Sequence, residues 1–152
     1  MGYFTKQPYF WVPSYLLIPR WLCLGVVHSL KLGFIGFSQG GAIAPLAASK
    51  LLEADFMVNV VGSAVSFNEQ LEFEIYNDVL SAGIPKFTAS LVTSAYTRRA
   101  KARRPVWWQK NGTYNPAPYI RRLKVPSLII FGGKDTNTPT EQSLKNLQEI
   151  KS

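Results

Sequence analysis

A serine between two glycines is the residue of this 152-residue chain best suited to nucleophilic chemistry. Ser38 lies in Gly36-Phe37-Ser38-Gln39-Gly40, a GxSxG pattern that follows an apolar run and precedes a run of small residues. This order is typical of a strand that turns sharply into a helix and holds the serine in a strained conformation with its Oγ exposed. The flanking glycines tolerate the crowding of such a turn. The pattern predicts a nucleophile elbow at Ser38, with a glycine-rich turn that has no chemistry as the alternative.

The residues on either side of Ser38 indicate the elements that would position it. Residues 32–37 are apolar on both alternating faces, which is typical of a central parallel strand covered by helices on both sides. Residues 41–48 are rich in alanine and predict a helix close to the sheet, whose first N–H groups point toward developing negative charge. Pro45 would remove one N–H from this helix and kink it.

Two further apolar runs, residues 56–61 and 127–131, predict strands that follow in the same direction. Strand, helix and strand then form a right-handed parallel crossover, so the expected fold class is α/β with a parallel sheet. Asp135 comes shortly after the last strand. Because ligands bind at the carboxyl edge of such sheets, Asp135 is a candidate functional carboxylate, and a turn-forming aspartate is the alternative.

Turn and capping signals indicate where the remaining helices begin. Residues 66–69 have the S-x-x-E form of a capping box. Residues 107–118 read as an aromatic loop that contains prolines. Residues 138–141 place an N-cap threonine, a first-turn proline and a capping-box glutamate before a last helix. We expect Leu144 and Leu147 on the buried face of that helix.

The net charge of +8 is concentrated in one segment. Residues 98–124 contain nine basic residues and no acidic residue. The first of them end a helix predicted over residues 86–104, where the helix dipole favours cations. A solvated helix end, a site that attracts acidic substrates, and a surface for anionic membranes or nucleic acid remain open. No nucleic-acid-binding motif accompanies the segment, so we expect no nucleic-acid partner.

Length and composition favour a single domain, since 152 residues with 47% hydrophobic side chains can bury one core. Cys23 and His28 are the only cysteine and the only histidine. They exclude an intrachain disulfide and metal sites built from several histidines or cysteines. We therefore expect no metal and no cofactor, with Cys23 as a small buried hydrophobe.

The first 30 residues form a hydrophobic N-terminal segment of their own. Pro13, Pro19 and Arg20 interrupt it, so no apolar run approaches the ~20 residues of a membrane-spanning helix. The segment also lacks the pattern of a secretory signal. We expect no membrane span and a cytoplasmic location, with packing or an ill-ordered end as the role of residues 1–30.

Over residues 31–152 the chain resembles an α/β-hydrolase. The segments that carry the resemblance are Ile35 to Pro45 around Ser38, Asn115 to Ile120, and Val125 to Asp135. They are similar to esterase-like hydrolases near the dienelactone hydrolase and prolyl oligopeptidase branches. The resemblance implies a partial α/β-hydrolase fold, a parallel sheet flanked by helices, with a short helical lid-like insertion over residues 86–122.

The resemblance also assigns roles to residues at the expected carboxyl edge of the sheet. Ser38 is then the nucleophile, Asp135 the carboxylate that orients a catalytic histidine, and the backbone N–H of Gln39 a donor to the oxyanion. Three aromatic residues of the insertion would line the substrate pocket, with ordinary packing as the alternative: Trp107, Trp108 and Tyr114.

The predicted function is that of a serine hydrolase that cleaves an ester, amide or peptide bond of a small molecule or peptide through an acyl-enzyme. The family order is serine, acid, histidine, but no histidine follows Asp135 and His28 precedes the elbow. The leading strands, the second oxyanion donor and the final strand also have no match, so we expect a truncated chain. The alternative is a catalytically incomplete remnant or binding protein that self-associates through exposed sheet edges.

Overall fold

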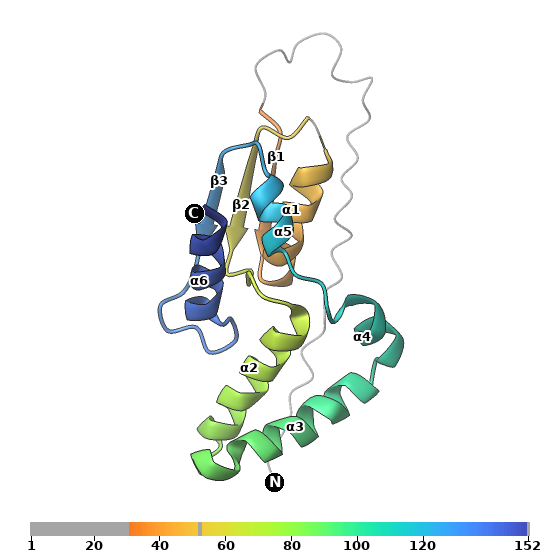
Figure 1. The fold of residues 1–152 in the computed structure, drawn as a ribbon, viewed down its shortest axis with the longest axis vertical. Helices are drawn as coiled ribbons and strands as arrows, with labels where there is room; N and C mark the ends of the chain where they lie inside the picture. The colour runs from red at the N-terminus through yellow and green to blue at the C-terminus, as the bar shows by residue number, and fades with distance from the viewer. Residues whose placement is uncertain (1–30, 52, 152) are drawn as a thin grey trace. The chain divides into compact units, whose positions relative to one another are not determined.

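The computed structural model describes residues 31–51 and 53–151. The predictions for residues 1–30, including Cys23 and His28, lie outside the described residues. Strands and helices alternate along the described chain, which confirms the α/β class (Figure 1). Their order is β1 (Gly33–Phe37), α1 (Gln39–Lys50), β2 (Phe56–Val60), α2 (Phe67–Ser81), α3 (Lys86–Ala102), α4 (Pro105–Asn111), α5 (Ala117–Arg122), β3 (Ser127–Ile130) and α6 (Thr140–Lys151).

The described strands form one parallel sheet in the order β1-β2-β3. The central strand is β2, whereas β1, which we expected at the centre, is an edge strand of the described sheet. The carboxyl ends of all three strands meet at one edge because the strands are parallel. The elbow after β1 and the loop after β3 therefore lie at the same edge, on either side of the end of β2.

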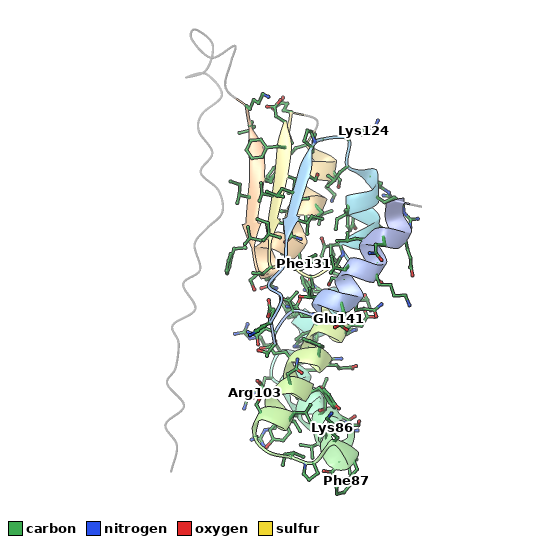
Figure 2. All side chains as sticks on the ribbon, turned by 90° about the vertical axis from the view of Figure 1, so that its left-hand side faces the viewer. Lys86, Phe87, Arg103, Lys124, Phe131 and Glu141 are labelled. Atoms are coloured by element: carbon green, nitrogen blue, oxygen red, sulfur yellow. The ribbon has the colours of Figure 1, made fainter. Side chains whose placement is uncertain are left out.

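One face of the sheet carries the hydrophobic core. Met57 on β2 is fully buried and packs against Ala44 and Ala48 of α1, with Phe34 and Ile129 beside them. The small alanine side chains allow α1 to lie close to the strands. Figure 2 shows α1, α5 and α6 on this same side of the sheet. Pro45 lies within α1 and is buried, and the helix continues through it.

The opposite face of the sheet is open within the described residues, which corrects the expectation of helices on both sides of β1. Ile35 and Phe37 are 73% and 70% exposed. The strand register extends this apolar surface across the sheet in two rows of aligned residues. These rows are Ile35, Val58 and Leu128, and Phe37, Val60 and Ile130.

The segment between β2 and β3 is helical throughout much of its length. The capping box at Ser66 and Glu69 is confirmed, since each residue bonds the backbone N–H of the other. The prediction of a loop over residues 107–118 is wrong, because α4 and α5 occupy most of it. Pro105 opens α4 at its first position, where the missing N–H costs nothing, so here proline begins a helix rather than a loop.

The start of α6 also differs from the prediction. The helix begins at Thr140, and the hydroxyl of Thr138, the expected N-cap, donates to the carbonyl of Val61, 3.1 Å away. Leu144 is 46% exposed, so its expected place on the buried face is wrong. Ser143 is buried instead, and its Oγ accepts a hydrogen bond from the N–H of Ala64 at 3.0 Å. A polar contact thus holds this helix in place, and the spacing of apolar residues in the sequence does not predict such a contact.

Candidate active site

Ser38 occupies the turn between β1 and α1 with a backbone conformation that side-chain-bearing residues rarely adopt. Its φ is 53° and its ψ is −121°. The residue is exposed, and its side chain makes no capping hydrogen bond to α1 although it stands at the N-cap position. A serine at this position normally gives its oxygen to the helix. The positive φ and the absence of a capping bond at Ser38 are the features expected of the predicted elbow.

Contacts with neighbouring backbone hold Ser38 in this conformation. Its N–H donates to the carbonyl of Val60 at 2.9 Å, and its carbonyl accepts from Ala42 N at 3.1 Å. A Cβ added at Gly36 would overlap the carbonyl of Gly40, whereas a Cβ at Gly40 would meet nothing within 4 Å. Crowding therefore requires only the first glycine of the motif, which corrects the expectation that both are required.

Asn59 is a buried polar residue beneath the elbow that sequence reasoning missed. Its Oδ1 accepts from Gly62 N at 2.7 Å and its Nδ2 donates to Gly62 O at 3.0 Å. The same Oδ1 fills the space that a Cβ at Gly41 would need. Asn59 thus braces the turn after β2 against the first turn of α1. An asparagine inside an apolar strand was the signal that could have identified it.

Val61, directly after β2, is a second strained position at this edge. Its φ is 51°, which is an outlier for a β-branched residue. Hydrogen bonds on both sides hold it: its N–H donates to Ile130 O at 2.8 Å, and its carbonyl accepts from Thr138. No feature of the sequence predicts a positive φ at a valine. Val61 follows the central strand, so this strained residue lies between the end of β1, which Ser38 follows, and the end of β3, which Asp135 follows.

Asp135 sits in the loop after β3 and organises that loop. Its Oδ1 accepts from the N–H groups of Asn137 and Thr138 at 2.8 and 3.0 Å. This is the turn-forming role that sequence analysis kept as the alternative, and it also fixes the direction of the carboxylate. Ser38 and Asp135 thus follow strands that end at one edge. Residues 31–152 contain no histidine to stand between them.

Gln39 is the first residue of α1. The first N–H groups of an α-helix have no intrahelical acceptor, and such groups can bind an anion. That position is adjacent to Ser38, as an oxyanion donor requires.

The three aromatic candidates pack mainly against one another and against α2. Trp107 stacks on Phe67, with ring centroids 5.8 Å apart, and meets Trp108 edge-on at 4.8 Å. Tyr114 lies 5.2 Å from Phe67 and donates its hydroxyl to the carbonyl of Ala42 at 2.9 Å. Burial, and then the neighbouring Tyr119, raise the pKa of Tyr114 to about 12, so its phenol stays protonated. This cluster ties the insertion to α1.

A groove lies elsewhere in the described residues, between α2 and α3. It has a volume of about 580 Å³. None of Ser38, Gln39 and Asp135 lines it, and neither do the three aromatic candidates. The groove is therefore separate from the candidate nucleophile. Across residues 31–51 and 53–151 no three His, Cys, Asp or Glu side chains gather where they could hold a metal ion. In the same ranges no helix is long and apolar enough to cross a membrane.

A comparison with solved structures gives the fold. An esterase from Pyrococcus furiosus matches with a TM-score of 0.50 and 20% sequence identity. The match covers 86% of this chain and 43% of the esterase, so the chain spans less than half of that structure. At this identity the likeness supports the fold alone, an α/β arrangement shared with part of an esterase. No curated protein matches the chain.

A comparison with family models gives the family. The model described as serine hydrolase (FSH1) matches residues 29–152, which is most of the chain and includes Ser38 and Asp135. The closer resemblance to the dienelactone hydrolase and prolyl oligopeptidase branches stays a prediction. By this match the chain belongs to the FSH1 family of serine hydrolases, an α/β-hydrolase-type group.

Proposed function

We propose that this chain acts as a serine hydrolase that cleaves ester, amide or peptide bonds of a small substrate through an acyl-enzyme on Ser38. The observation that carries the proposal is the conformation of Ser38, with φ 53° and ψ −121° at an exposed strand-to-helix turn. A structural role as a helix cap would use the hydroxyl, and this serine makes no capping bond. Membership of a serine hydrolase family agrees with this reading.

The proposed reaction has two steps. In the first, Ser38 Oγ attacks the substrate carbonyl carbon and loses its proton to a base, while the Gln39 N–H stabilises the oxyanion. The bond to the leaving alcohol or amine then breaks, and that group takes the proton. In the second step, water gives a proton to the base and attacks the acyl carbon. The bond from that carbon to Ser38 Oγ then breaks, the base returns its proton to Oγ, and the acid is released.

Asp135 is a positioning residue in this proposal. Its Oδ1 is held by two backbone N–H groups, which fixes the carboxylate at the carboxyl edge of the sheet. A carboxylate in such a place orients a histidine and stabilises its charged form. The only histidine of the chain, His28, lies outside the described residues.

A catalytically incomplete protein is the second candidate function. One observation favours it: the single histidine of the sequence, His28, precedes the elbow. Without a base, Ser38 stays protonated and is a poor nucleophile at neutral pH. Such a chain would keep the elbow without turning over an ester.

Hydrolysis of p-nitrophenyl acetate and butyrate separates the two candidates. We expect turnover by the purified chain that Ser38→Ala reduces at least 100-fold, and a smaller loss in Asp135→Asn. Ser66→Ala, which changes the serine at the start of α2, is the matched control and should keep wild-type turnover. If wild type and Ser38→Ala hydrolyse the esters at the same rate, the proposed function is wrong.

A further inference from the structure

Helix α3 buries two threonines and exposes two large apolar side chains. The buried residues Thr93 and Thr97 have hydroxyl oxygens with no hydrogen-bond partner. Phe87 and Leu91 are 88% and 77% exposed. Residues four apart lie on one side of a helix, so these two side chains form one stripe. A helix whose outer side meets only water is expected to show the opposite arrangement.

The exposed stripe continues into a basic surface on the same helix. The exposed residues Ala95, Arg98 and Arg99 follow Leu91 at helical spacing. We call these residues the outer face of α3: Phe87, Leu91, Ala95, Arg98 and Arg99. The wider charge has the same sign, since the chain has no acidic residue between Asp78 and Asp135. That stretch holds eleven basic residues, the nine of residues 98–124 with Lys86 and Lys134.

The outer face of α3 lies far from the sheet. The helix α2 leads away from the carboxyl edge of the strands, and α3 returns from its far end (Figure 1). Figure 2 places Lys86 and Phe87 at the end of this hairpin farthest from the strands. α2 packs against the other side of α3, across the groove that Thr93 and Thr97 line. Arg98 also lines this groove and so lies at the edge of the outer face, whereas Phe87, Leu91 and Arg99 do not line it. The stripe is thus presented outward and not toward the core.

The combination of apolar and basic side chains selects among possible partners. Nucleic acid would satisfy the arginines and leave the Phe87–Leu91 stripe without a contact. A second copy joined through the same face would bring arginines against arginines in a parallel pairing, or against the apolar stripe in an antiparallel one, and neither satisfies the charge. An anionic lipid surface satisfies both, because the headgroups attract Arg98 and Arg99 while Phe87 and Leu91 enter the boundary with the acyl chains.

We propose that the outer face of α3 is a docking surface for anionic membranes. The helix lies along the lipid surface and does not span the bilayer. Attraction between the headgroups and the basic side chains supplies much of the binding, so the binding is weak, reversible and sensitive to salt.

Co-sedimentation of the full chain with lipid vesicles tests this proposal. The vesicles are phosphatidylcholine alone, or phosphatidylcholine with 30% phosphatidylserine, at 50 and 500 mM NaCl. We expect binding to the anionic vesicles at low salt, and at least tenfold weaker partitioning at high salt or without phosphatidylserine. Phe87→Ser/Leu91→Ser and Arg98→Ser/Arg99→Ser should each weaken it at least tenfold. Leu128→Ser, on the exposed sheet face, is the matched control and should bind as wild type does.

Circular dichroism and light scattering on the same samples complete the test. Each variant must keep the helical signal of wild type, and the exposed positions of all five substitutions make this the expected result. No binding of wild type at low salt overturns the proposal, as does binding that Leu128→Ser abolishes while both α3 variants retain it. A dimer that Phe87→Ser/Leu91→Ser converts to a monomer would overturn it in favour of a second copy of the chain.

Discussion

Two serines stand at the starts of two helices in this molecule, and they use their hydroxyls differently. Ser66 precedes α2 with φ −66° and ψ 156°, and its side chain accepts from the backbone of Glu69 in a complete capping box. Ser38 precedes α1 with φ 53° and ψ −121° and makes no capping bond. The same residue type at the same helix position thus serves structure in one place and is left available in the other.

The difference lies in the surroundings of each turn. Ser66 is in an ordinary extended conformation that its own capping bonds stabilise. Ser38 is held by other groups: the bond to Val60, the close approach of Gly36 to Gly40, and the Asn59 brace. The elbow therefore costs free energy that its neighbours must offset, whereas the α2 cap is locally favourable.

The largest effect is expected when the close approach beneath the elbow is blocked. In Gly36→Ala the new Cβ would overlap the Gly40 carbonyl and lie 2.7 Å from Gly41 N, all of it backbone that cannot move aside cheaply. We expect a loss of about 3 kcal/mol or more in the free energy of unfolding. Urea denaturation followed by circular dichroism measures it.

Gly40→Ala is the control for that loss, since a Cβ there meets nothing within 4 Å. Gly40 lies inside α1, so alanine should be neutral or stabilise by up to about 1 kcal/mol. Equal destabilisation by the two substitutions would contradict the account of the elbow.

Removal of the α2 cap should have a moderate effect. Ser66→Ala deletes the hydroxyl that accepts from Glu69 N, and the loss of a capping side chain costs about 1 kcal/mol. Thermal unfolding should report a lower midpoint for this variant. Ser38→Ala should leave the midpoint almost unchanged, because its hydroxyl caps nothing; a drop as large as that of Ser66→Ala would remove the distinction between the two serines.

Relief of the strain at Ser38 should stabilise the protein. Glycine adopts a positive φ without the steric cost of about 1–2 kcal/mol that other residues incur. Glycine also loses more conformational entropy on folding than serine does, and this loss offsets part of the gain in stability. We expect Ser38→Gly to raise the free energy of unfolding by up to about 1 kcal/mol and to abolish ester hydrolysis. Destabilisation by this substitution would show that the backbone at Ser38 is not strained.

The smallest effect concerns a carboxyl within α2. Burial, and then the charge of Asp78, raise the pKa of Glu74 above 4.5. The folded state thus binds the proton of Glu74 more tightly than the unfolded state does. The contribution of this proton binding to the free energy of unfolding is therefore fully present below pH 4.5. It is lost as the pH rises through the folded pKa.

Glu74→Gln should therefore raise the free energy of unfolding at pH 7 by less than about 1 kcal/mol, and should leave it unchanged at pH 4. Differential scanning calorimetry at both pH values measures the change. Glu72→Gln, at an exposed position of the same helix, is the matched control. A gain of equal size at pH 4 would contradict the assignment to the charge of Glu74.

Sequence reasoning was most successful where local chemistry alone determines the structure. The GxSxG pattern, the apolar runs and the Ser66–Glu69 capping box predicted β1, α1, β2, β3 and the start of α2 to within a few residues. Each signal depends on neighbours in the chain, such as a turn glycine, a cap or a period of apolar residues. The family match over residues 29–152 agrees with the resemblance found at the same motifs.

The features that sequence reasoning missed depend on contacts between distant segments. The positive φ of Val61 is held by Ile130 and Thr138, about 70 residues away along the chain. In the sequence, Asn59 is a single polar residue in an apolar strand with no evident role. Its role depends on Gly41 and Gly62, which lie beside it only in the folded chain. The exposed outer face of α3 was likewise not predicted, because periodicity gives an apolar face without saying what covers it.

Labelling of the purified chain with a fluorophosphonate probe, read by intact-mass and peptide mass spectrometry, tests the central claim most directly. The probe forms a covalent adduct with an activated serine. The account predicts one adduct on Ser38, absent from Ser38→Ala and retained in Ser66→Ala. The absence of labelling at Ser38 in the folded wild-type chain, or labelling that persists in Ser38→Ala, would contradict the claim that Ser38 is the nucleophile.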